Sequence, residues 1–122
     1  GLNAVAAGIR TVDLSALTAG DAVTLDASAF NAGLTVKLHA GVDNITLGDG
    51  DDVLQGGVSA GDDIDLGAGD DTFSITTLAA VTIEGGTGLD TLVIGAGAGT
   101  RQVDFSNIVD QLSGDGTYLD FE

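Results

Sequence analysis

The chain contains no cysteine, proline, methionine or tryptophan among its 122 residues. Without cysteine, neither a disulfide nor a thiolate-bound metal can stabilise the fold. Four phenylalanines and one tyrosine are too few for an aromatic core, so Val, Ile, Leu and Ala must supply the buried surface. No apolar run approaches the roughly 18 residues of a membrane-spanning helix, and the first residues do not form a signal peptide. We therefore expect no direct membrane insertion.

Basic residues are equally scarce, with 3 Lys and Arg against 19 Asp and Glu and a formal net charge of −16. Nucleic acids and anionic membranes are polyanions, so neither is an expected partner, whereas cations are. The length suits a single domain. Because the chain begins at Gly1 and lacks methionine, we expect it to be a piece of a longer protein.

Short pairs of alternating apolar residues recur at a step of 11 residues. Alternation with a period of two predicts short, half-buried strands, and the Gly, Asp, Asn and Ser residues between them predict turns. Strands at a fixed step, with no room for helices between most of them, favour a solenoid. The first members of these pairs are Val12, Val23, Leu34 and Ile45, and later Val81, Leu92 and Val103.

Between residues 38 and 93 the step tightens to nine and a template appears, with glycine at its fourth place, aspartate at its sixth and a large apolar residue at its eighth. A fifth copy at 56–65 fits with a two-residue insertion that places Asp63 on the template and leaves Ile64 or Leu66 to fill the core. The segment 75–84 has lost the glycine and the aspartate. The four regular copies are LHAGVDNIT (38–46), LGDGDDVLQ (47–55), LGAGDDTFS (66–74) and GGTGLDTLV (85–93).

These nonapeptides resemble the G-G-x-G-x-D-x-U-x repeat of the RTX family of secreted bacterial proteins. The full pattern is present at 85–93, and leucine replaces the first glycine at 47 and 66. The resemblance implies a parallel β-roll with calcium between stacked turns. We therefore predict an all-β, right-handed parallel β-solenoid, with calcium-binding repeats at 38–93 and irregular end coils at 1–37 and 94–122.

Calcium takes six to eight oxygen ligands from carboxylates and carbonyls, so two stacked turns could each supply about half of a shell. Since successive turns alternate sides, we expect Asp52, Asp71 and Asp90 to stack on one side and Asp43 to stack with Asp63 on the other, for about three or more calcium ions. The expected ligands are Asp43, Asp49, Gly50, Asp52, Asp62, Asp63, Gly67, Gly69, Asp71, Gly86, Gly88 and Asp90.

No base lies among the aspartates between Asp43 and Asp71, so we expect calcium binding and folding to be coupled. The resemblance implies a calcium-dependent structural module of an extracellular or cell-surface bacterial protein, of the surface-layer or adhesin type, that self-associates or packs with other surface proteins. The alternative is an accessory folding module of a type I-secreted protease, lipase or epimerase. A third hypothesis, a module that binds polysaccharide or ice, has less support, because aromatic residues are few and the threonines form no regular ladder.

A G-x-S-x-G motif and the single histidine are the two features that could suggest catalysis, and their sequence context argues against both. GVSAG (57–61) matches the G-x-S-x-G nucleophile elbow, but no helical run follows it and the chain has a single histidine. We expect Ser59 to lie in a turn insertion and His39 to be a solvated turn residue. We therefore expect that the chain is not an enzyme.

Overall fold

The computed structural model describes residues 8–75, 79–95 and 117–119. Within these ranges there are ten short strands and no helix, and all the pairings between these strands are parallel. The strands are β1 (Thr11–Asp13), β2 (Ala22–Asp26), β3 (Thr35–Lys37), β4 (Val42–Thr46), β5 (Val53–Gly56), β6 (Asp63–Asp65), β7 (Thr72–Ile75), β8 (Thr82–Glu84), β9 (Thr91–Ile94) and β10 (Thr117–Leu119).

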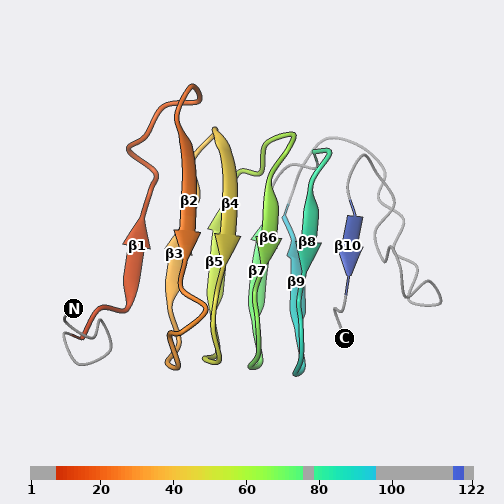
Figure 1. Cartoon of the computed structure of the whole chain (residues 1–122). Helices are drawn as coiled ribbons and strands as arrows, with labels where there is room; N and C mark the ends of the chain where they lie inside the picture. The colour runs from red at the N-terminus through yellow and green to blue at the C-terminus, as the bar shows by residue number, and fades with distance from the viewer. Residues whose placement is uncertain (1–7, 76–78, 96–116, 120–122) are drawn as a thin grey trace.

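Successive strands alternate between two sheets, so that each coil contributes one strand to each sheet (Figure 1). One sheet has the order β1-β3-β5-β7-β9 and the other the order β10-β8-β6-β4-β2. The chain is thus a parallel β-solenoid of about four turns, which confirms the predicted fold class. The strand predicted at Val103 lies outside the described residues.

The core follows from the alternation of side chains along each strand. In β7, Phe73 and Ile75 are buried while Thr72 and Ser74 face outward. The leucines that replace the first template glycine are also buried, which explains these departures from the repeat. The core consists of Leu34, Val36, Leu38, Ile45, Leu47, Leu54, Val58, Ile64, Leu66, Phe73, Ile75, Val81 and Ile83.

Burial decreases toward the N-terminal end of the solenoid. The inward-facing residues of the first coil, among them Val12, Leu14 and Leu25, are only partly buried and pack against the central cluster from one side. The best-packed coils are therefore those that carry the glycine and aspartate template, and they position the site.

Replacing Phe73 with alanine should strongly destabilise the solenoid, because this side chain is 0% exposed and fills the centre of the core. We expect a loss of about 3–5 kcal/mol in the free energy of unfolding, measured with denaturant in excess calcium. Leu89→Ala is the control, since Leu89 is 66% exposed and its truncation should cost no more than about 0.5 kcal/mol. Equal effects of the two variants would contradict this core.

Candidate metal site

Three turns that carry the template stack along one edge of the solenoid. They span residues 47–52, 66–71 and 85–90 and connect β4 to β5, β6 to β7 and β8 to β9 (Figure 1). We call this stack the acidic edge. Gly67 and Gly86 both have φ of +96°, and a Cβ on either would collide with a backbone carbonyl of the preceding turn. The template glycines thus allow neighbouring turns to approach at backbone contact.

The sixth template residue of each of these turns is a buried aspartate. Asp52, Asp71 and Asp90 are only 2%, 1% and 1% exposed. Oδ1 of Asp71 accepts a hydrogen bond from the N–H of Asp52 at 2.7 Å, and Oδ1 of Asp90 accepts one from the N–H of Asp71 at 2.9 Å. The ladder ends at Asp52, whose Oδ1 accepts the N–H of Leu34 at 2.7 Å. The structure therefore brings these three aspartates together, as the repeat spacing predicts.

Asp71 is the middle carboxyl of this ladder. Burial is the main cause that raises the pKa of Asp71 to about 7, and the negative charges of Asp52, Asp90 and Asp51 add to the rise. Its Oδ2 is buried and has no hydrogen-bond partner among the residues that the structure describes. A buried carboxyl in this situation needs either a proton or a cation.

A second row of carboxylates runs along the solvent side of the same edge. Oδ1 of Asp51 accepts the N–H of Asp70 at 3.1 Å, and Oδ1 of Asp70 accepts the N–H of Leu89 at 3.0 Å. These bonds point to the following coil, whereas those of the buried row point to the preceding one. The Asp-Asp dipeptide at 70–71 consequently ties its coil to both neighbours. The exposed side chain of Asp49 joins neither row.

The acidic edge offers the oxygen donors that calcium prefers. Within the described residues, the carbonyls of Gly50 and Gly69 accept no backbone hydrogen bond, whereas that of Gly67 accepts one from the next turn. In the third turn, Gly86 and Gly88 lie directly against Gly67 and Gly69 of the second turn. No group of three or more His, Asp or Glu side chains converges as a metal cluster in these ranges. A calcium shell here would therefore combine carboxylates with backbone carbonyls.

The opposite edge, formed by the turns from β1 to β2, β3 to β4 and β5 to β6, differs from the prediction. Its register pairs Asn44 with Asp63, so it is Asp62 whose Oδ1 accepts the N–H of Asp43, at 2.9 Å. The expected stacking of Asp43 with Asp63 is wrong, because Ile64 must face the core and the alternation then turns Asp63 outward. Asp62 is 2% exposed.

His39 is buried, so the expectation of a solvated turn residue is wrong. It is 5% exposed, and its Nε2 lies 2.8 Å from Oδ1 of Asp43, which is 0% exposed. Nδ1 of His39 accepts the N–H of Gly41 at 2.9 Å, which leaves the ring proton on Nε2. Burial raises the pKa of Asp43, and the nearby imidazole opposes that rise.

Ser59 lies in the turn before β6, as expected. Its N–H donates to Oδ2 of Asp62 at 2.8 Å. No helix follows Ser59 in the described part of the chain, so the strand-turn-helix geometry of a nucleophile elbow is not found there.

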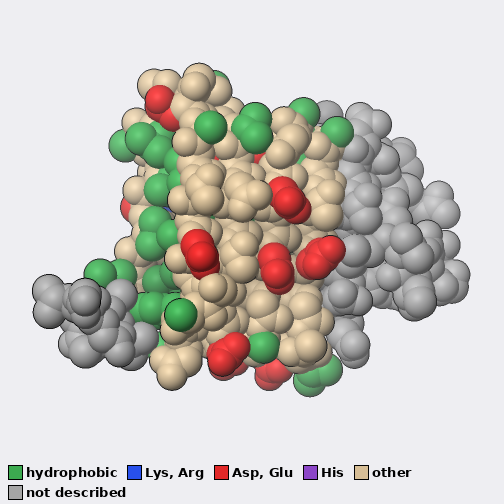
Figure 2. All heavy atoms as spheres, in the orientation of Figure 1, with side chains coloured by type: hydrophobic (Ala, Val, Ile, Leu, Met, Phe, Trp, Pro, Cys, Tyr) green, Lys and Arg blue, Asp and Glu red, His purple; other side chains and the backbone are tan. Residues whose placement is uncertain are grey.

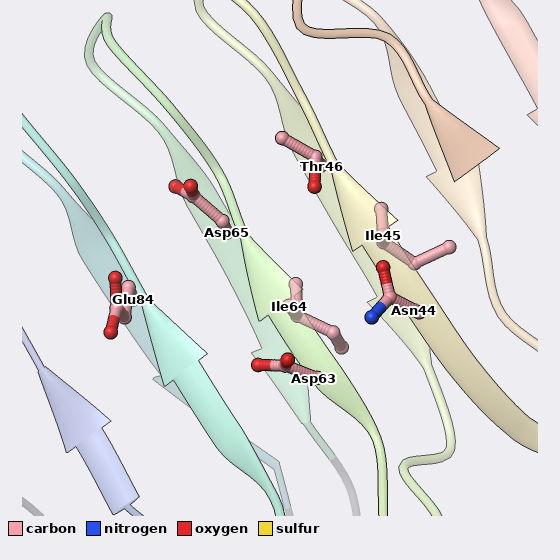
Figure 3. Close-up of a pocket in the computed structure, with 7 residues that line it drawn as sticks. All are labelled: Asn44, Ile45, Thr46, Asp63, Ile64, Asp65 and Glu84. Atoms are coloured by element: carbon pink, nitrogen blue, oxygen red, sulfur yellow. The ribbon is translucent and has the colours of Figure 1, made fainter. Parts of the chain in front are cut away.

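The outward face of the sheet that contains β4, β6 and β8 is acidic (Figure 2). Asp63, Asp65 and Glu84 line an open hollow of about 310 Å³ together with Asn44 and Thr46 (Figure 3). Asp65 and Glu84 are register partners on neighbouring strands. Unlike the buried row of the acidic edge, this face keeps its carboxylates in contact with water.

Comparisons with protein-family models, curated proteins and solved structures found no match to the chain. In the described ranges, no helix is long and apolar enough to cross a membrane. The class of protein is therefore defined by fold and site together: a parallel β-solenoid with stacked, buried aspartates along its edges.

Gly86→Ala should disrupt the stacking of the turns. The residue has φ of +96° and its added Cβ would meet the backbone of Gly67, so we expect a loss of more than about 1 kcal/mol in thermal or urea unfolding. Gly57→Ala is the matched control, because nothing lies within 4 Å of its Cβ position. If the two variants were equally stable, the close approach of the turns would be wrong.

Without calcium, the fold should become more stable on acidification. The folded-state pKa of Asp71 is about 7 against an ordinary 3.8, so its protonation stabilises the fold fully below about pH 4, and this contribution is lost as the pH rises through 7. Hydrogen bonds from Ser15 lower the pKa of Asp13 to about 2, so Asp13 weakens the fold only below this window.

Urea unfolding in calcium-free buffer should therefore show stability falling by on the order of a few kcal/mol between pH 4 and pH 7. Asp71→Asn should flatten this dependence, because the amide does not titrate. A calcium-free stability that stays level or rises over the same range would contradict the raised pKa.

Proposed function

We propose that this chain is a calcium-dependent structural module whose ions bind between the stacked turns of the acidic edge. The observation that carries the proposal is Asp71, a buried carboxyl between two others, whose Oδ2 has no hydrogen-bond partner in the described part of the chain. In the described ranges, the two basic residues lie elsewhere. Lys37 pairs with Asp13 at 3.0 Å, and Arg10 lies 5.8 Å from the ring centre of Phe30. Neither of these two cations therefore balances the charge of Asp71.

Asp52, Asp71 and Asp90 would hold the ions, with the carbonyls of Gly50 and Gly69 as further donors. A bound divalent cation attracts all the carboxylates around it, and this attraction offsets the repulsion between them. In its absence, ionised carboxylates oppose the docking of one coil on the next. Calcium binding is thus coupled to folding, since the unfolded chain has no such stack of turns.

The role that suits this chemistry is non-catalytic and extracellular. The repeats resemble those of secreted RTX proteins, which supports a module of a surface-layer or adhesin type of bacterial protein that assembles with its own kind or with other surface proteins. Extracellular modules commonly bind calcium with Kd of about 10⁻⁴–10⁻³ M. With such an affinity, the module would stay unfolded in a calcium-poor cytosol and would fold outside the cell.

Calcium titration with calorimetry and circular dichroism should show binding in this range together with a gain in strand structure. For each site, calcium at 100 times Kd should add about 2.7 kcal/mol to the free energy of unfolding. Asp71→Asn keeps the size of the side chain and an acceptor for the N–H of Asp52 but removes the charge. It should reduce both the number of bound ions and the calcium-dependent stabilisation.

Asp63→Asn is the control, because it removes the same charge from the outward face of β6 and should leave calcium binding unchanged. Two results would contradict the proposal. One is a chain that is equally stable in chelator and in excess calcium at neutral pH, and the other is an Asp63→Asn variant that loses as much calcium binding as Asp71→Asn.

A further inference from the structure

The two edges of the solenoid balance their carboxylates in different ways. On the acidic edge, the side chains that act on Asp71 are other carboxyls. On the opposite edge, each turn carries a short repeat of its own, in which a donor residue precedes Ala-Gly and an aspartate follows it. The copies are Thr18-Ala19-Gly20-Asp21, His39-Ala40-Gly41-Val42-Asp43 and Ser59-Ala60-Gly61-Asp62.

The first and third copies close on themselves through backbone donors. Oδ2 of Asp21 accepts the N–H of Thr18 at 2.8 Å, and Oδ2 of Asp62 accepts the N–H of Ser59 at 2.8 Å. In return, the N–H of each aspartate donates to the carbonyl of the same Thr or Ser, at 2.9 and 3.1 Å. Each of these carboxylates is thus held by its own turn.

The middle copy has one more residue, Val42, between glycine and aspartate. Its aspartate is therefore four residues beyond the donor position instead of three, and the imidazole of His39 takes over the contact. Nε2 lies 2.8 Å from Oδ1 of Asp43, while Nδ1 is fixed by the N–H of Gly41. Both side chains are buried, and the other donor to the carboxyl of Asp43 is the backbone of Val23 on the preceding coil.

Gly41 provides the room for this arrangement. A Cβ at this position would collide with the imidazole of His39 and with the backbone carbonyl of Asp21 on the preceding coil. The ring is therefore enclosed between its own turn and the turn before it, and its orientation is determined by packing as well as by hydrogen bonding.

We propose that His39 is a positioning residue. At the opposite edge, it takes the place that a bound cation takes at the acidic edge. Its Nε2–H holds the buried carboxylate of Asp43, so that this edge closes without a metal and calcium binding is confined to the acidic edge. This inference rests on the proposed function for the location of the ions. It replaces the expected calcium site at Asp43 with a contact made by the protein itself.

Calcium stoichiometry tests the confinement of the ions. Calorimetry on the 122-residue chain should give fewer ions for Asp71→Asn than for the native sequence, and an unchanged number for Asp43→Asn and His39→Ala. Loss of an ion in Asp43→Asn, with or without a change in His39→Ala, would overturn the proposal.

Thermal melts in saturating calcium test the role of His39. His39→Ala should lower Tm by about 10 °C or more, because it removes the imidazole that contacts a buried carboxylate. His39→Gln should recover a large part of this loss, since its amide can also donate a hydrogen bond. Equal Tm values for His39→Ala and the native chain would overturn the proposal, as would a Gln variant no better than Ala.

Nitrogen-15 NMR provides a readout that does not depend on any variant folding, because the chain has one histidine. The folded protein should show the Nε2–H tautomer with a bare Nδ1, and the signals should not respond to calcium beyond any change that accompanies folding. An Nδ1–H tautomer would overturn the proposal, as would a ring N–H proton that exchanges rapidly with water. If the native chain binds no calcium, the proposed function fails, while the tautomer and the melts still decide the role of His39.

Discussion

The structure depends on burying like-charged carboxylates one above another at the spacing of parallel strands. At that spacing of about 4.8 Å, two ionised carboxylates repel by about 3–4 kcal/mol at an effective dielectric constant near 20. The aspartates cannot turn outward, because Asp52 and Asp71 lie two residues before Leu54 and Phe73 and so share their inward side. The core that stabilises each coil is therefore also what places the repelling charges together.

The protein meets this constraint in two ways within one coil. Backbone N–H groups supply one donor to each carboxylate along both edges, and this is common to Asp52, Asp71 and Asp62. The remaining charge is balanced at the opposite edge by a turn N–H or by an imidazole, both built into the chain. For Asp71, in the middle of the acidic edge, a proton or an external cation must supply the balance. Each coil of a solenoid contacts chiefly its two neighbours. The charge between one pair of coils can therefore be balanced independently of the charge between the next pair.

The sequence predicts the fold and the acidic edge well, because two periodicities agree there. The nine-residue template specifies the phase of each aspartate relative to a core residue, and the alternation of sides specifies which copies stack. The predicted pairing of Asp43 with Asp63 was wrong because the fifth copy contains two adjacent aspartates. Only the inward position of Ile64 distinguishes Asp62 from Asp63. The burial of His39 was missed because a single histidine carries no periodic signal. The repeated Ala-Gly-Asp turn could have indicated it, since His39 occupies the position of Thr18 and Ser59.

The contrast between the buried carboxylates of the acidic edge and the acidic sheet face shows which charges bear on the proposed metal dependence. Asp63, Asp65 and Glu84 lie on neighbouring strands, as the ladder residues lie on neighbouring turns, yet they border an open hollow in which water screens their repulsion. The ladder aspartates are at most 2% exposed and lack that screening. A formal net charge of −16 is therefore not the basis of the proposed cation dependence. The proposed dependence rests on the few carboxylates that the repeat places in the interior, and above all on Asp71, whose neighbours in the ladder are other carboxyls.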